Sequence, residues 1–452
     1  MAMRWHRCWQ ILLALCILPL PHARSLALGS VLTQAPQEVK PASLPAVRVH
    51  ADETLWQSPW FQRFVEHLRK GVHADRFQPE DCKRSHVLLY FSASPPCEQS
   101  TQAAPASPFS QQSLGLPPQP EVAYAYLQHL GFRFWHPLAP VAPAAIPADR
   151  LLNFSSDLPA PRLKRRGFLL HTMHPLELTH VLNGWGLQGP EDEAGWRDLL
   201  PQWERYLEWL VAHRQNKVEW VLLEKGRWRS FSRSSRRQKR LRELVEMAHD
   251  WGIEVGVDAP MALQQQNGWR LVTDPSADLA DTEQQIERHL DWLMGAGFDF
   301  VGTEMGSTEF SNSGAQRMVH WLNHATDYLS RRYHKKFTTK VHISSGQTTE
   351  AYPDPDTGEP LNFNFLPFYA DPRLGVLPHT VQVYALDDPA PTYGQQDFQS
   401  MLRFMLWVQA ANTQNPAQHR SMYWYPETAY WVNYDNTVPL FLPVYAHRRL
   451  HD

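Results

Sequence analysis

The chain has 452 residues but only four cysteines, a net charge of −3, and no long apolar run beyond its amino-terminal segment. The small net charge gives no basis for binding nucleic acid. The missing apolar run predicts that no segment of the mature protein spans a membrane stably. The sequence also lacks a glycine-rich loop that would cradle phosphate and an elbow that would present a serine or cysteine nucleophile.

Residues 1–27 have the pattern of a secretory signal peptide. Arg4 and Arg7 form its charged region, and the apolar stretch Ile11–Leu18 is too short to span a bilayer. Residues 28–46, which contain Pro, Ala and Gln without a clear period, are typical of a linker. We therefore expect an exported protein, either secreted or periplasmic.

Two cysteines would remain after signal cleavage, Cys82 and Cys97. An even pair in an exported protein favours a disulfide bond between them. Two free thiols are the alternative.

The segment 47–155 is predicted to be a small α/β domain. It contains an apolar strand at 86–91, a helix at 121–130 that ends before a glycine, and an alternating strand at 132–135. The proline-rich stretch 138–162 follows and marks the boundary to the next domain.

From residue 160 to residue 452, short apolar strands alternate with helix-length stretches, which predicts a parallel sheet of the TIM-type (β/α) barrel. Seven strands are expected, at 167–171, 218–224, 253–258, 298–304, 339–344, 380–386 and 421–425. A complete barrel needs eight, so either one strand is unrecognised, the barrel is incomplete, or the chain is truncated.

Five segments in this order resemble the small α/β domain and first barrel strands of family 20 β-hexosaminidases and family 67 α-glucuronidases. They are Glu121–Pro137, Arg166–Leu170, Arg214–Leu223, Ala248–Val255 and Phe298–Glu304. The resemblance implies a glycoside hydrolase-like protein that acts on carbohydrate.

One position departs from that resemblance. Phe298–Glu304 lies where family 20 carries an Asp-Glu pair, and Thr303 stands at the aspartate. In that family the aspartate orients the acetamido group of the substrate, which acts as the nucleophile. The threonine therefore argues against that substrate-assisted chemistry.

Two glutamates are the predicted catalytic residues. Glu304 ends the fourth barrel strand, where apolar neighbours would raise its pKa enough to keep a proton for the leaving oxygen. Glu427 follows the seventh strand and would act as nucleophile or base. The alternatives are a structural carboxylate for Glu304 and a helix N-terminal charge for Glu427.

Further side chains near the carboxyl ends of the strands are predicted to bind substrate, because those ends meet at one mouth of a barrel. Acidic and aromatic residues would bind sugar hydroxyls and stack on sugar faces, and a basic side chain would hold an anionic sugar such as a uronate. Each of these side chains could instead have a purely structural role, by capping a turn, packing in the core or lying on a solvated helix face. The candidates are His171, Glu224, Arg227, Asp258, Glu309, Tyr384, Asp387 and Trp424.

The sequence thus predicts an exported glycoside hydrolase that uses carboxylate catalysis on a poly- or oligosaccharide. No cofactor is implied, and His171 with His174 is a poor metal signal because no further ligand lies at a suitable spacing. A non-catalytic carbohydrate-binding protein on a degenerate barrel is the main alternative. A polysaccharide lyase that uses His171 and Tyr384 is a third possibility.

Overall fold

The computed structural model describes residues 45–78, 81, 87–92, 96, 112–170, 178–224, 229–263, 268–305, 314–342, 346–380 and 399–426. Their strands form a four-stranded sheet, a seven-stranded sheet and a two-stranded hairpin. Within these ranges, no helix combines the length and the apolar composition needed to cross a bilayer.

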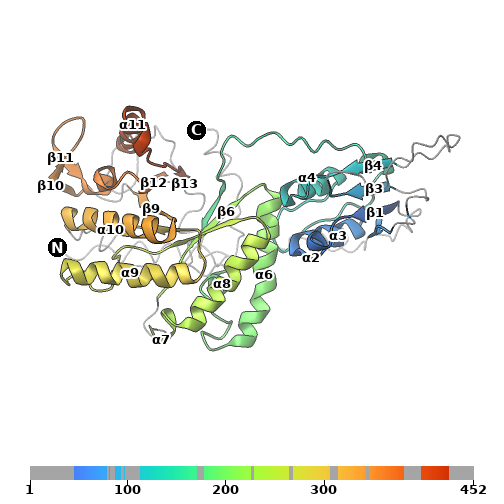
Figure 1. Cartoon of the computed structure of the whole chain (residues 1–452), viewed down its shortest axis with the longest axis horizontal. Helices are drawn as coiled ribbons and strands as arrows, with labels where there is room; N and C mark the ends of the chain where they lie inside the picture. The colour runs from blue at the N-terminus through green and yellow to red at the C-terminus, as the bar shows by residue number, and fades with distance from the viewer. Residues whose placement is uncertain are drawn as a thin grey trace, which may run out of the picture. The chain divides into compact units, whose positions relative to one another are not determined.

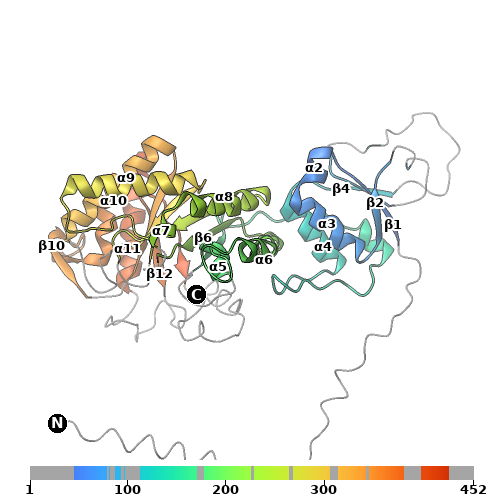
Figure 2. The same ribbon diagram turned by 90° about the horizontal axis from the view of Figure 1, so that it is seen from below.

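The amino-terminal part is a parallel sheet with strand order β2-β1-β3-β4. Its strands are β1 (Ala46–His50), β2 (His73–Arg76), β3 (Val87–Tyr90) and β4 (Gln112–Gly115). The helices α2 (Glu53–Gln57), α3 (Pro59–Arg69) and α4 (Pro120–Leu130) accompany it, and α3 packs beside α4 (Figure 2). Aromatic rings fill the core, where Phe61 meets Phe91 edge to face at 4.9 Å.

The predicted helix at 121–130 is confirmed by α4. Residues at its two ends explain where it begins and stops. Pro120 begins the helix, where its missing N–H costs nothing, and Gly131 ends it with a left-handed φ of 107°. The strand expected at 132–135 is reduced to one bridge, between Arg133 and Val141.

The second sheet confirms the barrel-type prediction. Its seven parallel strands lie in chain order, β5-β6-β7-β8-β9-β12-β13, as in a TIM barrel that has not closed. They are β5 (Gly167–Leu170), β6 (Lys217–Val221), β7 (Glu254–Asp258), β8 (Phe300–Thr303), β9 (Lys336–Val341), β12 (Gly375–Thr380) and β13 (Tyr425–Pro426).

Helices connect these strands and cover the outer face of the sheet, and α9 runs beside α10 (Figure 1). They are α5 (Thr179–Leu182), α6 (Glu193–Ala212), α7 (Arg229–Ser232), α8 (Ser235–Asp250), α9 (Leu279–Gly295), α10 (Ala315–Tyr333) and α11 (Gln399–Gln414). Side chains cap three N-termini: Asp192 begins α6, Ser234 begins α8 and Asp278 begins α9. Short 3-10 turns lie at Ala148–Leu151, Phe363–Tyr369 and Pro416–Gln418.

Three strands differ from their predicted positions. The fifth barrel strand, β9, begins three residues earlier than expected, the sixth, β12, is Gly375–Thr380 rather than 380–386, and the seventh, β13, is Tyr425–Pro426 rather than 421–425. Pro378 concealed β12, because proline normally marks a strand edge or end. The hairpin of β10 (Thr348–Pro353) and β11 (Pro360–Asn362) was not predicted at all.

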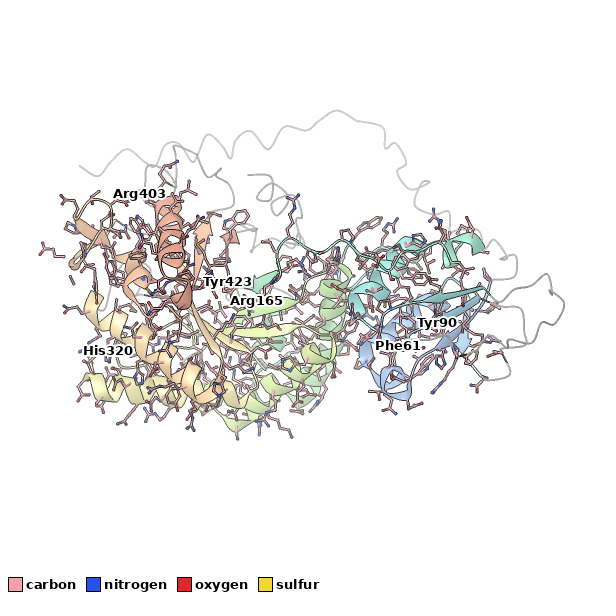
Figure 3. The ribbon with its side chains drawn as sticks, turned by 45° about the horizontal axis from the view of Figure 1, so that its top comes forward. Phe61, Tyr90, Arg165, His320, Arg403 and Tyr423 are labelled. Carbon is pink, nitrogen blue, oxygen red and sulfur yellow. The ribbon has the colours of Figure 1, made fainter. Side chains whose placement is uncertain are left out.

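The two outermost strands of the seven-stranded sheet are β5 and β13, and side chains link the segments just before them. Arg165 donates a hydrogen bond of 2.7 Å to the Tyr423 hydroxyl, and its guanidinium lies 4.9 Å from the Tyr423 ring (Figure 3). Arg165 also binds Glu254 on β7 through two nitrogens. This contact joins the two edges of the sheet at the amino-terminal end of the strands.

A buried carboxylate joins the small sheet region to the first long barrel helix. Glu208 on α6 accepts hydrogen bonds from Tyr124 Oη at 2.7 Å and Arg63 Nη2 at 3.1 Å, and its Oε1 lies 2.7 Å from His67 Nε2. Burial alone would raise the pKa of Glu208, but the His67 hydrogen bond and the charges of His67 and Arg63 outweigh it and lower that pKa. Ionised Glu208 therefore stabilises the fold.

We expect Glu208→Gln to lower the free energy of unfolding by about 3 kcal/mol at pH 7, because it removes one partner of a buried ion pair. The lowered pKa means that this stabilisation is present above the ordinary glutamate pKa of about 4.3 and is lost as the pH falls through the folded-state pKa. Urea unfolding of both proteins across this pH range measures the effect. Glu66→Gln is the control, since Glu66 binds the same Arg63 but is exposed. An equal loss in both variants would contradict the prediction.

Candidate functional site

The seven-stranded sheet carries charged side chains on its inner face, which faces away from the helices. Alternate residues such as Val218, Val255 and Val301 belong to the core beneath the helices. Their neighbours in sequence point the other way. A Cβ added at Gly302 would overlap the Glu219 carboxylate, so the glycine gives that buried carboxylate its space across the sheet.

The charged side chains meet at the carboxyl-terminal ends of the strands. Lys340 Nζ of β9 lies 2.7 Å from Asp258 Oδ2 of β7 and 3.1 Å from Glu304 Oε2, just after β8. His342 Nε2 lies 3.4 Å from Glu304 Oε1. The His342 ring in turn lies against the ring of His379 of β12, with ring centroids 4.3 Å apart and ring planes tilted by 38°. We call Asp258, Glu304, Lys340, His342 and His379 the mouth cluster.

Exposure rises in steps through the mouth cluster. The side chain of Asp258 is fully buried and that of Lys340 is 4% exposed, whereas Glu304 is 13% and His342 is 22% exposed. A ligand that arrives from solvent can therefore contact Glu304 and His342 but cannot contact Asp258.

Burial and charge set the protonation of the deep pair. Burial raises the pKa of Asp258 to about 6, although the Lys340 ammonium pulls that pKa down. Burial would lower the pKa of Lys340, but the carboxylates of Asp258 and Glu304 raise it well above its ordinary value. At neutral pH the deep pair is therefore an ammonium ion beside the ionised Asp258 carboxylate.

His342 is in the opposite situation. Burial lowers its pKa below the ordinary histidine value, Lys340 lowers it further, and Glu304 only partly compensates. His342 is therefore a neutral imidazole at physiological pH, able to accept a proton.

Glu304 directly follows β8, close to its predicted place at the end of that strand, but its surroundings differ from the apolar ones expected. The flanking apolar residues in the sequence point into the core, and the neighbours of the carboxylate itself are Lys340 and His342. A cation and a hydrogen-bond donor stabilise the ionised form of a carboxylate. This geometry therefore suits Glu304 to the role of nucleophile or base better than to that of a general acid, which must hold a proton. Thr303 is fully buried and donates to the Ala259 carbonyl oxygen at 2.9 Å.

Glu224 and Trp424, two of the predicted substrate-binding residues, already have partners. Glu224 follows β6 and pairs with Arg233 Nη1 at 2.5 Å, and Arg233 also donates to His289 Nε2 at 3.0 Å. Trp424 is half-buried and donates from Nε1 to Thr380 Oγ1 at 3.2 Å.

Several predicted residues lie outside the described part of the chain, and their roles stay predictions. The catalytic candidate Glu427 is one of them, so its distance from Glu304 is not defined. The others are the substrate-binding candidates His171, Arg227, Glu309, Tyr384 and Asp387 and the disulfide candidates Cys82 and Cys97.

Sequence reasoning missed three members of the mouth cluster: Lys340, His342 and His379. Lys340 and His342 lie within the predicted fifth strand, where their spacing of two residues places them on one face. That alternation was the available signal. His379 could not be found, because the sixth strand was predicted after it rather than around it.

A metal site is not evident where the structure is described. In those ranges, no group of three or more His, Cys, Asp or Glu side chains is arranged to hold a metal ion. The mouth cluster places an ammonium ion at its centre, where a metal would be repelled.

No protein-family model and no curated protein matches the chain. Among solved structures, it is similar to an X-ray structure of a chitobiase from Flavobacterium johnsoniae (FjGH20), with a TM-score of 0.46 and 10% identity over 90% of this chain and 61% of that one. It is also similar to CpGH84B, with a TM-score of 0.30 and 12% identity over 47% of this chain and 33% of that one. The chain thus spans less than two thirds of either protein. The strand order itself, rather than either likeness, establishes the fold.

We expect Lys340→Met to lower the free energy of unfolding by about 3–5 kcal/mol at pH 8, because Asp258 would then be a buried carboxylate without a counter-ion. Loss of the ammonium raises the pKa of Asp258 further. The difference in free energy of unfolding between the two proteins should therefore be smaller at pH 5, where Asp258 is neutral in both. Chemical denaturation at the two pH values measures it.

Two further variants make this prediction sharp. Asp258→Asn combined with Lys340→Met should recover part of the loss, since no buried charge remains unpaired. Lys336→Met changes an exposed lysine at the other end of β9 and should cost less than about 1 kcal/mol. If Lys340→Met lowers the free energy of unfolding equally at both pH values, the ion pair is not the cause of the lost stability.

Proposed function

We propose that the chain is a glycoside hydrolase-like enzyme that binds a carbohydrate at the mouth cluster and cleaves a glycosidic bond there. The observation that carries the proposal is the partly exposed Glu304 carboxylate, held by Lys340 beside a neutral imidazole at the carboxyl-terminal end of β8. In barrels of this type, that end of the strands is where substrates bind.

The separation of the carboxylates bears on which residues react. The nearest oxygens of Asp258 and Glu304 are no more than about 5.8 Å apart, because they lie 2.7 and 3.1 Å from the same Lys340 Nζ. Retaining glycosidases place their two carboxyl groups about 5–5.5 Å apart. Spacing alone would allow this pair, but Asp258 is fully buried and cannot reach a sugar. We therefore assign Asp258 to holding Lys340 and keep Glu427 as the candidate second carboxyl group.

Aromatic side chains support a sugar as the ligand. The ring of His379 contacts that of Tyr425 at a tilt of 43°, with ring centroids 5.1 Å apart, and Trp424, next to Tyr425 in the chain, is half-buried. Such rings bind the apolar faces of sugars. Lys340 already pairs with two carboxylates, so selection of an anionic sugar would depend on Arg227.

Non-catalytic carbohydrate binding is the second candidate function. The observation that favours it is the double pairing of Lys340, which neutralises Glu304 in the same way as a structural ion pair. The buried Thr303 adds to it, since this side chain cannot reach a substrate. The amino-terminal signal pattern supports export for either function, to the periplasm or the exterior.

We expect Glu304→Gln to lower kcat/KM by about 10²–10⁴-fold, the usual contribution of a proton-transfer group, while sugar binding persists. The measurement is hydrolysis of a panel of aryl glycosides and oligosaccharides, neutral and acidic, with calorimetric binding of the same sugars. Glu246→Gln, an exposed glutamate on α8, controls for the loss of one charge. Binding without turnover in the unmodified protein would favour the non-catalytic function instead.

A further inference from the structure

His342 is the most exposed side chain among the four ion-pairing members of the mouth cluster. Its side chain is 22% exposed, against 13% for Glu304 and 4% for Lys340. A sugar and its attacking water that enter the mouth would therefore meet the imidazole before they meet the deeper carboxylates.

The groups around His342 hold it in a defined orientation. Glu304, after β8, lies 3.4 Å from Nε2. The ring of His379 of β12 packs against the His342 ring at a tilt of 38°, and Tyr425 of β13 packs against His379. Lys340 lies on the same strand and pairs with the same Glu304. When Nε2 directs its proton at Glu304, the other ring nitrogen, Nδ1, carries the lone pair.

We propose that His342 is the catalytic base of this site and that Glu304 is its anionic partner, an inference that rests on the proposed glycosidase function. Glu304, paired with Lys340, orients the imidazole and stabilises the imidazolium that forms. The arrangement follows the logic of a base held by a carboxylate, as in the serine protease triad.

The proton balance of the step is simple. His342 Nδ1 takes one proton from water as the water oxygen bonds to the anomeric carbon, and the bond from that carbon to the leaving oxygen breaks. The leaving oxygen takes a proton from solvent, and His342 then returns its proton to solvent. The net reaction consumes one water and produces two hydroxyl groups.

Three variants test this role against the unmodified full chain, with the substrate found in the glycoside panel. His342→Gln should lower kcat/KM by about 10²–10⁴-fold while the thermal unfolding midpoint and sugar binding stay unchanged. Added imidazole should restore part of the activity of His342→Ala, which a purely structural role would not allow. His320→Gln is the matched control, because His320 also pairs with a glutamate, Glu283 at 2.7 Å, but lies on the outer helix α10 (Figure 3).

The pH profile of the unmodified enzyme gives a second measurement that needs no variant. A neutral base predicts that kcat/KM falls as the pH drops below the pKa of His342, which lies below the ordinary histidine value. A rate that instead rises steadily as the pH falls from about 7 to about 5 would overturn this role, since a protonated imidazole cannot accept a proton.

The outcomes separate the two proposals. Full activity in His342→Gln together with its loss in Glu304→Gln overturns the role of His342 and leaves the glycosidase function standing. Loss of activity in His342→Ala without recovery by imidazole also overturns the role. No turnover of any sugar by the unmodified protein overturns the proposed function, and the catalytic role of His342 with it.

Discussion

The contact on which the mouth of the sheet depends is the ammonium of Lys340 between the carboxylates of Asp258 and Glu304. A carboxylate as buried as Asp258 is strongly disfavoured unless an opposite charge lies within contact distance. Lys340 provides this charge for Asp258 and at the same time holds Glu304 at the rim. Stability and a reactive surface group are thus coupled through one side chain.

The rest of the inner face accommodates this arrangement. Gly302 leaves room for the buried carboxylate of Glu219, which pairs with Lys217 at 3.0 Å. At the other end of the strands, Arg165 binds Tyr423 and Glu254 and so links the edges of a sheet that does not close on itself within the described residues. Charge pairing therefore continues along the inner face, where a closed barrel would normally hold layers of branched apolar side chains.

The position of each group within this network gives it a different chemical role. Asp258 is too deep to meet a substrate, so its role is to keep Lys340 charged and in place. Glu304 and His342 lie nearer to solvent, where a carboxylate and a neutral imidazole in contact can share the transfer of a proton. Depth, rather than residue type, separates the structural from the reactive groups.

The fold was largely predictable from local patterns. Helical periodicity and a terminal glycine located α4, and apolar runs located the first four barrel strands to within a few residues, because these signals depend only on neighbours in sequence. The sixth strand was misplaced, since Pro378 lies inside a fully buried strand that the surrounding sheet stabilises.

The sequence by itself predicted a parallel barrel-type sheet and placed Glu304 and Asp258 at the carboxyl-terminal ends of two of its strands. Only the tertiary structure decided that Lys340 lies between these carboxylates and that the rings of His342 and His379 pack together beside Glu304. The physical reason is that strand ends on β7, β8, β9 and β12 come together only when the sheet forms, across more than a hundred residues of chain. Burial and charge then follow from that packing, and no local pattern specifies them.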